Sequence, residues 1–406
     1  IAITIPPYTP DAPTFFPSDP FPAGERFSLA GRVANVEPSA IWIADAFATV
    51  RVAGHADLEV GDLVVLRVSR PRDTTELHAV TERHRSNVVP GREHARLFVQ
   101  GVGQKLRARA QALEDVRSFF SARDFLEVDT PLLVRSPGLD LHLAAVSTTD
   151  GFLITSPEYQ LKRLLSGGIP RLYQLSHVFR RGEAGPAHNP EFTMLEWYRA
   201  FAGVADVMRD TEELVVSVVE SIVGRPEIRT ERGPIFLEPP FLRLSVAEAF
   251  ERHAGIDGDR ALALAHDDPD SYFRLLVDQV EPALALIDRP LFLVDYPISQ
   301  ASLARAKPGD PRVCERFELY LGGLELCNGF GELTDPVEQR QRLERDQKAR
   351  AALGLEVYPI DERFLEALEE GMPPSAGNAL GFDRLLMLCL GEREIGRVQP
   401  LPSGIL

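Results

Sequence analysis

Residues 179–198 read FRRGEAGPAHNPEFTMLEWY, in which a Gly- and Pro-rich loop separates an outgoing strand from a returning one. Glu196 lies between Leu195 and Trp197 in an apolar run, where an unpaired carboxylate would be costly to bury. Because side chains alternate along a strand, each strand presents one face that can be read from the sequence. These faces comprise Phe192, Met194, Glu196 and Tyr198 on the returning strand, and Gln174, Ser176, Val178 and Arg180 on the outgoing strand. Together they predict the floor of a site for a nucleotide and a cationic small molecule.

A second segment, residues 316–335 (RFELYLGGLELCNGFGELTD), has the pattern of a β-hairpin that turns at the Gly-Gly pair 322–323. A two-residue turn there predicts that Glu318 faces Cys327. Glu318 and Glu325 would then lie diagonally on one surface, within reach of a common ion. Mg²⁺ bridging phosphate oxygens fits such a pair. Two solvated glutamates on an exposed sheet face are the alternative.

Other charged residues have both a functional and a structural interpretation. Arg384, in the apolar segment GNALGFDRLLML, either clamps a phosphate or pairs with a distant carboxylate in the core. Glu158, in TSPEYQLKRLL, either binds a ligand or favours the dipole of a helix N-terminus. His188 and Asn189 can be turn residues. Together these groups supply the positive charge, metal site and alignment that phosphoryl or nucleotidyl chemistry needs, without a P-loop or a Rossmann motif.

The composition, with 44% hydrophobic and 26% charged residues in 406, is that of a globular protein with two or three domains. The net charge of −16 argues against nucleic-acid binding by bulk electrostatics. Cys314, Cys327 and Cys389 are widely spaced, which predicts free thiols in a reducing cytoplasm. We find no signal-peptide pattern and no apolar stretch of membrane-spanning length, so we expect no membrane association.

The hydrophobic pattern changes along the chain. Residues 1–24 hold seven prolines and are predicted to form an extended arm. Residues 25–92 alternate short β-rich runs with turns, which indicates a small barrel or sandwich. An amphipathic helix is predicted at 104–122. Residues 379–390 are apolar nearly all round and predict a buried helix.

Three ordered segments resemble the motifs of the catalytic domain of class II aminoacyl-tRNA synthetases. They are the helix at 104–122 with the strand ending at Pro131, the segment 179–198, and the segment 377–388. The resemblance implies an α+β fold, with a catalytic domain at 96–406 built on a six-stranded antiparallel sheet with flanking helices. The β-rich region at 25–92 then resembles an OB-fold, and a homodimer formed through the first motif is expected.

Within that class, HNPEFTMLEWY and ELCNGFGELTD are similar to the lysyl enzymes. TSPEYQLKRLL, QASLAR, DPRVCERFELY and ALEEGMP look more like their paralogues, the elongation factor P–(R)-β-lysine ligases. Ala379 stands where that family has alanine and lysyl-tRNA synthetases have glycine, which implies a pocket reshaped toward (R)-β-lysine.

The resemblance implies activation of (R)-β-lysine or lysine by ATP as an aminoacyl-adenylate, followed by transfer to a lysine side chain of elongation factor P. A lysyl-tRNA synthetase that charges tRNA is one alternative, which the OB-like region favours and Ala379 opposes. A non-catalytic regulatory paralogue is the other, and the retained arginines and glutamates argue against it.

The resemblance also implies residue roles. Arg180 would hold the α-phosphate and Arg384 the γ-phosphate, both as catalytic residues, and Phe192 would stack on adenine. The other ATP contacts would be Gly182, Glu183, His188, Asn189, Glu325, Leu326 and Gly381. Glu318 and Glu325 would bind Mg²⁺. The amino-acid substrate would contact Ser156, Glu158, Glu196, Tyr198, Asn328, Glu332 and Ala379, with Glu196, Tyr198 and Glu332 around its distal ammonium.

Two features depart from the family pattern. The second motif often begins Arg-x-Glu, but Gly182 stands at the third position here, so Glu183 is expected to recognise adenine. The best-known paralogues lack an OB-like domain. The one in this chain has no lysine and few exposed aromatic candidates (Trp42, Phe47), which is a weak signal for single-strand binding.

Overall fold

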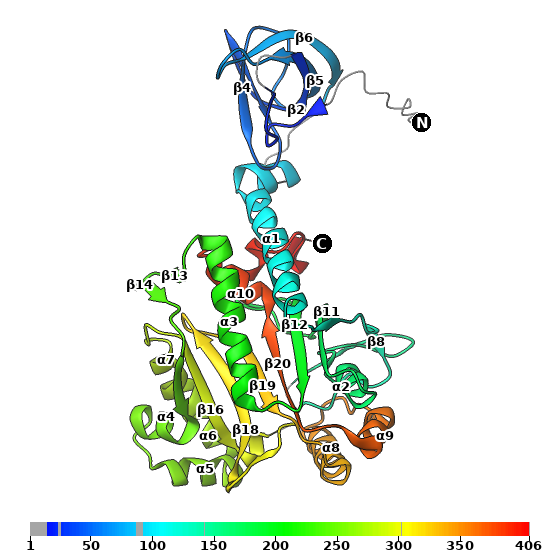
Figure 1. Cartoon of the computed structure of the whole chain (residues 1–406), viewed down its shortest axis with the longest axis vertical. Coiled ribbons are helices and arrows are strands. Elements are labelled where there is room, and N and C mark those ends of the chain that lie inside the picture. The colour runs from blue at the N-terminus through cyan, green and yellow to red at the C-terminus, as the bar shows by residue number, and fades with distance from the viewer. Residues whose placement is uncertain (1–13, 23–25, 87–91, 142, 302, 406) are drawn as a thin grey trace. The chain divides into compact units, whose positions relative to one another are not determined.

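The structure is a computed structural model, and it describes residues 14–22, 26–86, 92–141, 143–301 and 303–405. The chain divides into two compact units, residues 1–108 and 109–406 (Figure 1). The helix α1 (Val102–Ser121) runs through the division. The domain boundaries expected from the sequence, 25–92 and 96–406, stay predictions, and residues 1–13 of the expected arm lie outside the described residues.

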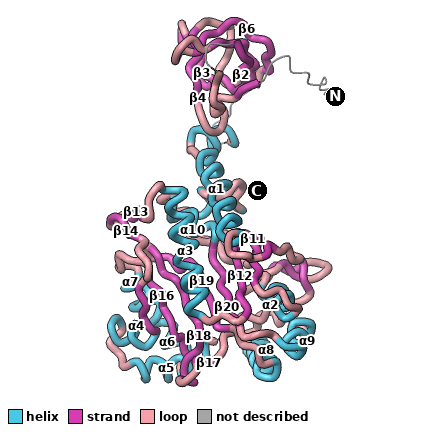
Figure 2. Tube along the Cα trace, in the orientation of Figure 1, coloured by secondary structure: helices cyan, strands magenta, loops and turns pink. Residues whose placement is uncertain are grey.

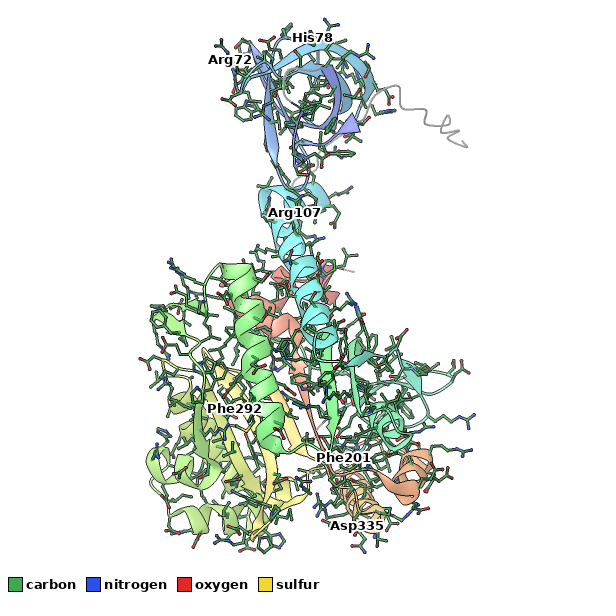
Figure 3. The ribbon with its side chains drawn as sticks, viewed as in Figure 1. Arg72, His78, Arg107, Phe201, Phe292 and Asp335 are labelled. Atoms are coloured by element: carbon green, nitrogen blue, oxygen red, sulfur yellow. The ribbon has the colours of Figure 1, made fainter. Side chains whose placement is uncertain are left out.

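In the first unit, five strands close into a barrel in the order β2-β3-β4-β6-β5, with β5 pairing back onto β2. The strands are β2 (Arg26–Glu37), β3 (Ala40–Ala44), β4 (Thr49–Ala53), β5 (Leu63–Ser69) and β6 (Thr75–His84). Alternating side chains such as Leu29, Val33 and Ile43 are fully buried inside it. Arg72 and His78 are exposed on its surface (Figure 3). The all-β, OB-like fold expected for this region is therefore confirmed.

A short N-terminal strand joins this barrel. Strand β1 (Thr14–Phe15) pairs in parallel with β2, and the Phe15 and Phe27 ring centres lie 5.3 Å apart. Part of the expected arm therefore packs on the barrel. A single π-turn, η1 (Ala95–Val99), precedes α1.

The second unit is built on a nine-stranded sheet whose middle six strands, β16-β18-β19-β20-β12-β11, are all antiparallel. This confirms the expected six-stranded sheet, which β7 and β15 extend as parallel edge strands. The strands are β7 (Leu126–Glu127), β11 (Arg171–Phe179), β12 (Glu191–Ala200), β15 (Leu242–Ser245), β16 (Leu291–Pro297), β17 (Ala306–Lys307), β18 (Asp310–Leu321), β19 (Leu324–Gly331) and β20 (Ser375–Gly381).

Smaller strands lie outside this sheet: β8 (Leu133–Val134), β9 (Val146–Ser147), β10 (Phe152–Leu153), β13 (Glu227–Thr230) and β14 (Gly233–Phe236). The helices are α2 (Glu158–Ser166), α3 (Val204–Val223), α4 (Val246–His253), α5 (Gly258–Asp267), α6 (Pro269–Leu275), α7 (Glu281–Leu284), α8 (Pro336–Ala352), α9 (Glu362–Gly371) and α10 (Phe382–Cys389). Single turns are η2 (Leu276–Val280), η3 (Ile298–Gln300), η4 (Ile395–Arg397) and η5 (Ser403–Ile405).

The main core lies between one face of the sheet and helices α3 and α10 (Figure 2). Leu195 and Trp197 of β12 point into this core, as does Phe292 of β16, which Figure 3 labels. The opposite side chains of β12, such as Met194 and Glu196, face the other way. The sheet thus has one apolar face under α3 and one face free to carry polar groups.

Two local expectations were wrong. The hairpin 318–328 turns at Gly322-Gly323 as predicted, but Leu326 forms a β-bulge, so Glu318 pairs with Asn328 instead of Cys327. The bulge leaves Glu318 and Glu325 on one face and turns Cys327 into the core. The helix expected at 379–390 begins only at Phe382, because residues 379–381 complete the central strand β20.

Candidate active site

A cavity of about 250 Å³ opens on the polar side of the sheet. Its floor comes from β12, β19 and β20, which lie side by side (Figure 2). Its walls come from α2, α8, the start of α10, the loop 180–190, the segment 136–140 and Leu143. Sequence-distant segments therefore converge on one hollow in the second unit.

A row of side chains crosses this floor in strand register. Glu196 of β12 pairs with Ala379 of β20, Ala379 with Asn328 of β19, and Asn328 with Glu318 of β18. Asn328 reaches this row because of the bulge at Leu326. The Ala379 methyl group thus separates a carboxylate from an amide whose Oδ1 has no hydrogen-bond partner among the described residues.

Glu196 is held at the centre of the floor by two hydroxyl groups. Ser156 Oγ donates to Glu196 Oε2 at 2.7 Å, and the Tyr198 hydroxyl donates to Oε1 at 2.6 Å. The side chain is 1% exposed. Burial, and then the charge of Glu158, raise the pKa of Glu196 to about 8. A cationic group is the partner that would restore its charge at neutral pH.

Lys162 of α2 is a site residue that the sequence interpretation missed. Its Nζ lies 2.5 Å from Glu158 Oε1 and 2.5 Å from Glu332 Oε2. Burial alone would lower the pKa of Lys162, but these two carboxylates raise it. The spacing of Glu158 and Lys162, i and i+4 on a helix, was the available signal. Burial is the main cause that raises the pKa of Glu332, to about 7. The positive charge of Lys162 lowers this pKa, and the negative charge of Glu158 raises it.

Arg384 reaches the cavity from the first turn of α10. Its guanidinium donates to the backbone carbonyls of Ala187 and Glu325 at 3.2 and 2.8 Å. It also contacts His188 Nε2 at 2.7 Å. Burial, and then the charge of Arg384, lower the pKa of His188, so the neutral imidazole accepts this hydrogen bond. No carboxylate of the described residues forms an ion pair with Arg384. The structure therefore does not show Arg384 as a core arginine paired with a carboxylate. Its guanidinium is available to bind an anion.

Asp383 anchors this end of α10. It forms a buried ion pair with Arg109 of α1, and its Oδ2 accepts bonds from the Thr193 backbone N–H at 3.0 Å and from Gln399 Nε2 at 2.7 Å. Arg109 also donates to Thr193 Oγ1 at 2.7 Å. Three segments far apart in the sequence thus fix the residue beside Arg384.

Arg180 and Phe192 form the remaining wall. The Arg180 guanidinium lies 5.2 Å from the Phe192 ring centre, within range of a cation–π contact, and 3.8 Å from Glu183. Gly182 has a φ of 85°, a conformation that glycine adopts without strain. Asn189 uses its amide within the protein, donating to Glu191 O at 2.6 Å and accepting from Ser403 Oγ at 2.6 Å.

The carboxylates of Glu318 and Glu325 differ in how far the protein already binds them. Glu318 is bound by Arg316 at 2.6 Å and by the Tyr320 hydroxyl at 3.0 Å. The Glu325 carboxylate has no hydrogen-bond partner among the described residues, and burial, and then Glu318, raise its pKa to about 7. This pair fits one divalent ion whose other ligands come from water or substrate. The described residues contain no cluster of three or more metal-type side chains.

The structure brings most of the predicted site residues to one cavity. Its walls include Ser156, Glu158, Arg180, Glu183, His188, Asn189, Phe192, Glu325, Leu326, Asn328, Ala379, Gly381 and Arg384. Gly182, Glu196, Tyr198, Glu318 and Glu332 are not among the described lining residues. Glu196 and Glu332 adjoin the cavity through their bonds to Ser156 and Lys162.

Comparison with known proteins identifies the family. Residues 90–404 match the family described as tRNA synthetases class II (D, K and N). The chain is 41% identical over 308 residues to the elongation factor P–(R)-β-lysine ligase of Proteus mirabilis, covering 73% of this chain and 94% of that protein. It is 42% identical over 320 residues to the enzyme of the same name from Edwardsiella ictaluri, covering 72% and 93%. The one from Photorhabdus laumondii is 42% identical over 304 residues, covering 72% and 93%.

The chain belongs to the class II tRNA synthetase family and is an ATP-dependent ligase. The family match begins at residue 90, so the barrel strands β2–β6 lie outside it. None of the helices in the described part of the chain has the length and hydropathy needed to cross a lipid bilayer.

Proposed function

We propose that the protein activates (R)-β-lysine or lysine with ATP and transfers the aminoacyl group to a lysine side chain of elongation factor P. The observation that carries this proposal is the row of Glu196, Ala379 and Asn328 beside Ser156 and Tyr198. A buried carboxylate that lacks a cation and lies next to a hydrogen-bonding amide suits an amino acid with a side-chain amine. The relatives at about 40% identity bear the name of this reaction.

In the first step, a substrate carboxylate oxygen attacks the α-phosphorus of ATP, and pyrophosphate leaves. Arg180 and Arg384 would bind the phosphates and offset negative charge in the transition state. Phe192 would stack on adenine beside Glu183. Mg²⁺ held at Glu325 and Glu318 would add positive charge at the phosphates. Glu196 and Tyr198 would fix the substrate amine, so that the carboxylate is aligned for attack.

In the second step, the neutral amine of the acceptor lysine attacks the carbonyl carbon of the adenylate. AMP leaves, an amide bond forms, and the amine loses a proton. Because transfer needs no further cofactor, the cavity only has to hold the adenylate and exclude water. A homodimer and a cytoplasmic location are further parts of this proposal.

The test measures ATP consumption and product mass with (R)-β-lysine or lysine, in the presence of elongation factor P and, separately, of bulk tRNA. We expect the mass of elongation factor P to increase by one aminoacyl group, with (R)-β-lysine preferred. Charging of tRNA with lysine and no mass added to elongation factor P would contradict the proposal.

A further inference from the structure

A buried cation that the proposed function does not use lies next to Glu158, at the acidic end of the cavity. Lys162 is 1% exposed, and its ammonium is shared by Glu158 and Glu332 at 2.5 Å each. The nitrogen also lies 5.9 Å from the centre of the Tyr198 ring. Two of the three carboxylates expected around the substrate amines are therefore held by the protein itself.

The three residues that carry these carboxylates are linked by hydrogen bonds and ion pairs. The Glu158 backbone N–H donates to Ser156 Oγ at 3.1 Å, and that hydroxyl donates to Glu196 at 2.7 Å. Lys162 connects Glu158 to Glu332 on the other side. Glu196 lies close enough to this group that the charges of Glu158 and Lys162 both influence its pKa.

The charges of this network can be counted. Glu158, Glu196 and Glu332 contribute three negative charges when ionised, and Lys162 contributes one positive charge, which leaves a net charge of −2. Arg305, the other cation close to Glu332, is paired with Glu315 at 2.5 Å. A diamino acid brings two ammonium groups, while its carboxylate is joined to AMP. Without Lys162, a third buried negative charge would lack a partner, which is costly.

We infer that Lys162 is a positioning residue that matches the charge of this subsite to a substrate with two amines, by holding Glu158 and Glu332. Lys162 stays in place when the substrate binds, and the substrate ammonium groups take the remaining charge. This inference rests on the proposed function, because it assumes a diamino acid substrate.

Amino-acid-dependent exchange of pyrophosphate into ATP tests the inference with two variants. Lys162→Met removes the charge and keeps much of the apolar volume. Lys162→Met/Glu332→Gln removes one charge of each sign and restores the net charge of −2. Arg163→Met is the matched control, because it removes a positive charge from the next, exposed position of α2. Thermal unfolding of each variant reports on its folding.

We expect Lys162→Met to raise the KM for the diamino acid at least about tenfold, with the KM for ATP within about twofold of the unmodified protein. The double variant should recover part of this loss, with a KM for the diamino acid at least about threefold below that of Lys162→Met. Arg163→Met should change neither value. This pattern separates charge matching from loss of structure, because a folding defect would affect both substrates.

An unchanged or lower KM for the diamino acid in Lys162→Met would overturn the inference, and a lower value would mean that Lys162 only fills the place of the substrate amine. Failure of a folded double variant to recover would overturn it as well. If the unmodified protein shows no exchange with (R)-β-lysine or lysine, the proposed function itself fails, and the inference falls with it.

Discussion

Glu196 shows how one residue links burial to function. Its carboxylate is 1% exposed and accepts two hydroxyl hydrogen bonds, yet no cation among the described residues pairs with it directly. Burial opposes its charge more strongly than two neutral hydrogen bonds favour it, so its pKa rises to about 8. The unliganded protein therefore carries a proton at Glu196 near neutral pH. A substrate ammonium has to displace that proton.

We predict that substrate binding releases a proton below about pH 8, and that kcat/KM for the diamino acid rises from about pH 6 to about pH 8. The neighbouring Glu158, Lys162 and Tyr198 influence this titration. By linkage, the raised pKa contributes stability that is fully present below about pH 4.5 and is lost as the pH rises through about 8. Calorimetry in two buffers of different ionisation enthalpy measures the released proton.

Glu196→Gln is the control for this experiment. It should bind the diamino acid weakly at every pH and release no proton. A pH-independent KM in the unmodified protein would show that Glu196 is already ionised before the substrate arrives.

At the residue scale, the sequence predicted site residues where a charged side chain interrupts an apolar run. Glu196 could be found because a carboxylate interrupts an apolar run, and Arg384 because an arginine interrupts another. Lys162 and Arg109 could not be found this way, since each lies on an amphipathic helix where a charged residue is ordinary. Their partners Glu332 and Asp383 are 170 and 274 positions away, and only the tertiary fold brings them together.

Among the elements, β20 is notable because its residues on the cavity side have small side chains or none. Its positions on the cavity side are Gly377, Ala379 and Gly381, which alternate along the strand. A Cβ at Gly377 would lie 2.3 Å from two Tyr198 ring carbons and 3.0 Å from Glu332 Oε1. The small residues thus leave room for Tyr198 of β12 and for Glu332, which follows β19.

We predict that Gly377→Ala displaces the Tyr198 ring, destabilises the protein by about 1–3 kcal/mol and raises the KM for the diamino acid more than the KM for ATP. Thermal unfolding and the exchange assay measure the two effects. Gly381→Ala is the graded comparison for stability. The nearest atoms to a Cβ there would be those of the flexible Arg384 side chain, at 3.4 Å and beyond, so the loss of stability should be smaller. Equal losses in both variants would contradict this account.

The existence of the elements followed from periodicity, but their local geometry did not. The Gly-Gly turn and the alternating strands were visible in the sequence. The bulge at Leu326 was not, because a regular ladder and a bulged one have the same residue pattern until the pairing partner is known. The start of α10 was predicted three residues too early, because an all-apolar run fits a buried strand as well as a buried helix.

For the whole molecule, the barrel and the cavity belong to different units. All described residues that line the cavity lie between positions 136 and 395, and the family match begins at residue 90. Only 72 to 73% of this chain aligns with the Proteus mirabilis and Edwardsiella ictaluri enzymes, yet that part covers 93 to 94% of their length. The barrel strands contribute none of the described residues that line the cavity, so we expect amino-acid activation not to depend on them.

We predict that a chain beginning at Arg92 keeps amino-acid-dependent pyrophosphate exchange within about threefold of the full chain. The exchange assay is run on both chains, with thermal unfolding as the control for folding. Loss of exchange in a shortened chain that still unfolds cooperatively would assign the barrel a part in activation.

The position of β20 has a consequence for the synthesis of the protein. This strand pairs with β12 on one side and with β19 on the other, yet among the described residues it follows every other strand in the sequence, at residues 375–381. Until the ribosome has made it, β12 and β19 present open edges and Arg384 does not yet exist. A nascent chain stopped at α9 is therefore both catalytically silent and prone to pair its free edges with other chains. The active site can therefore form only after residues 375–384 have been synthesised.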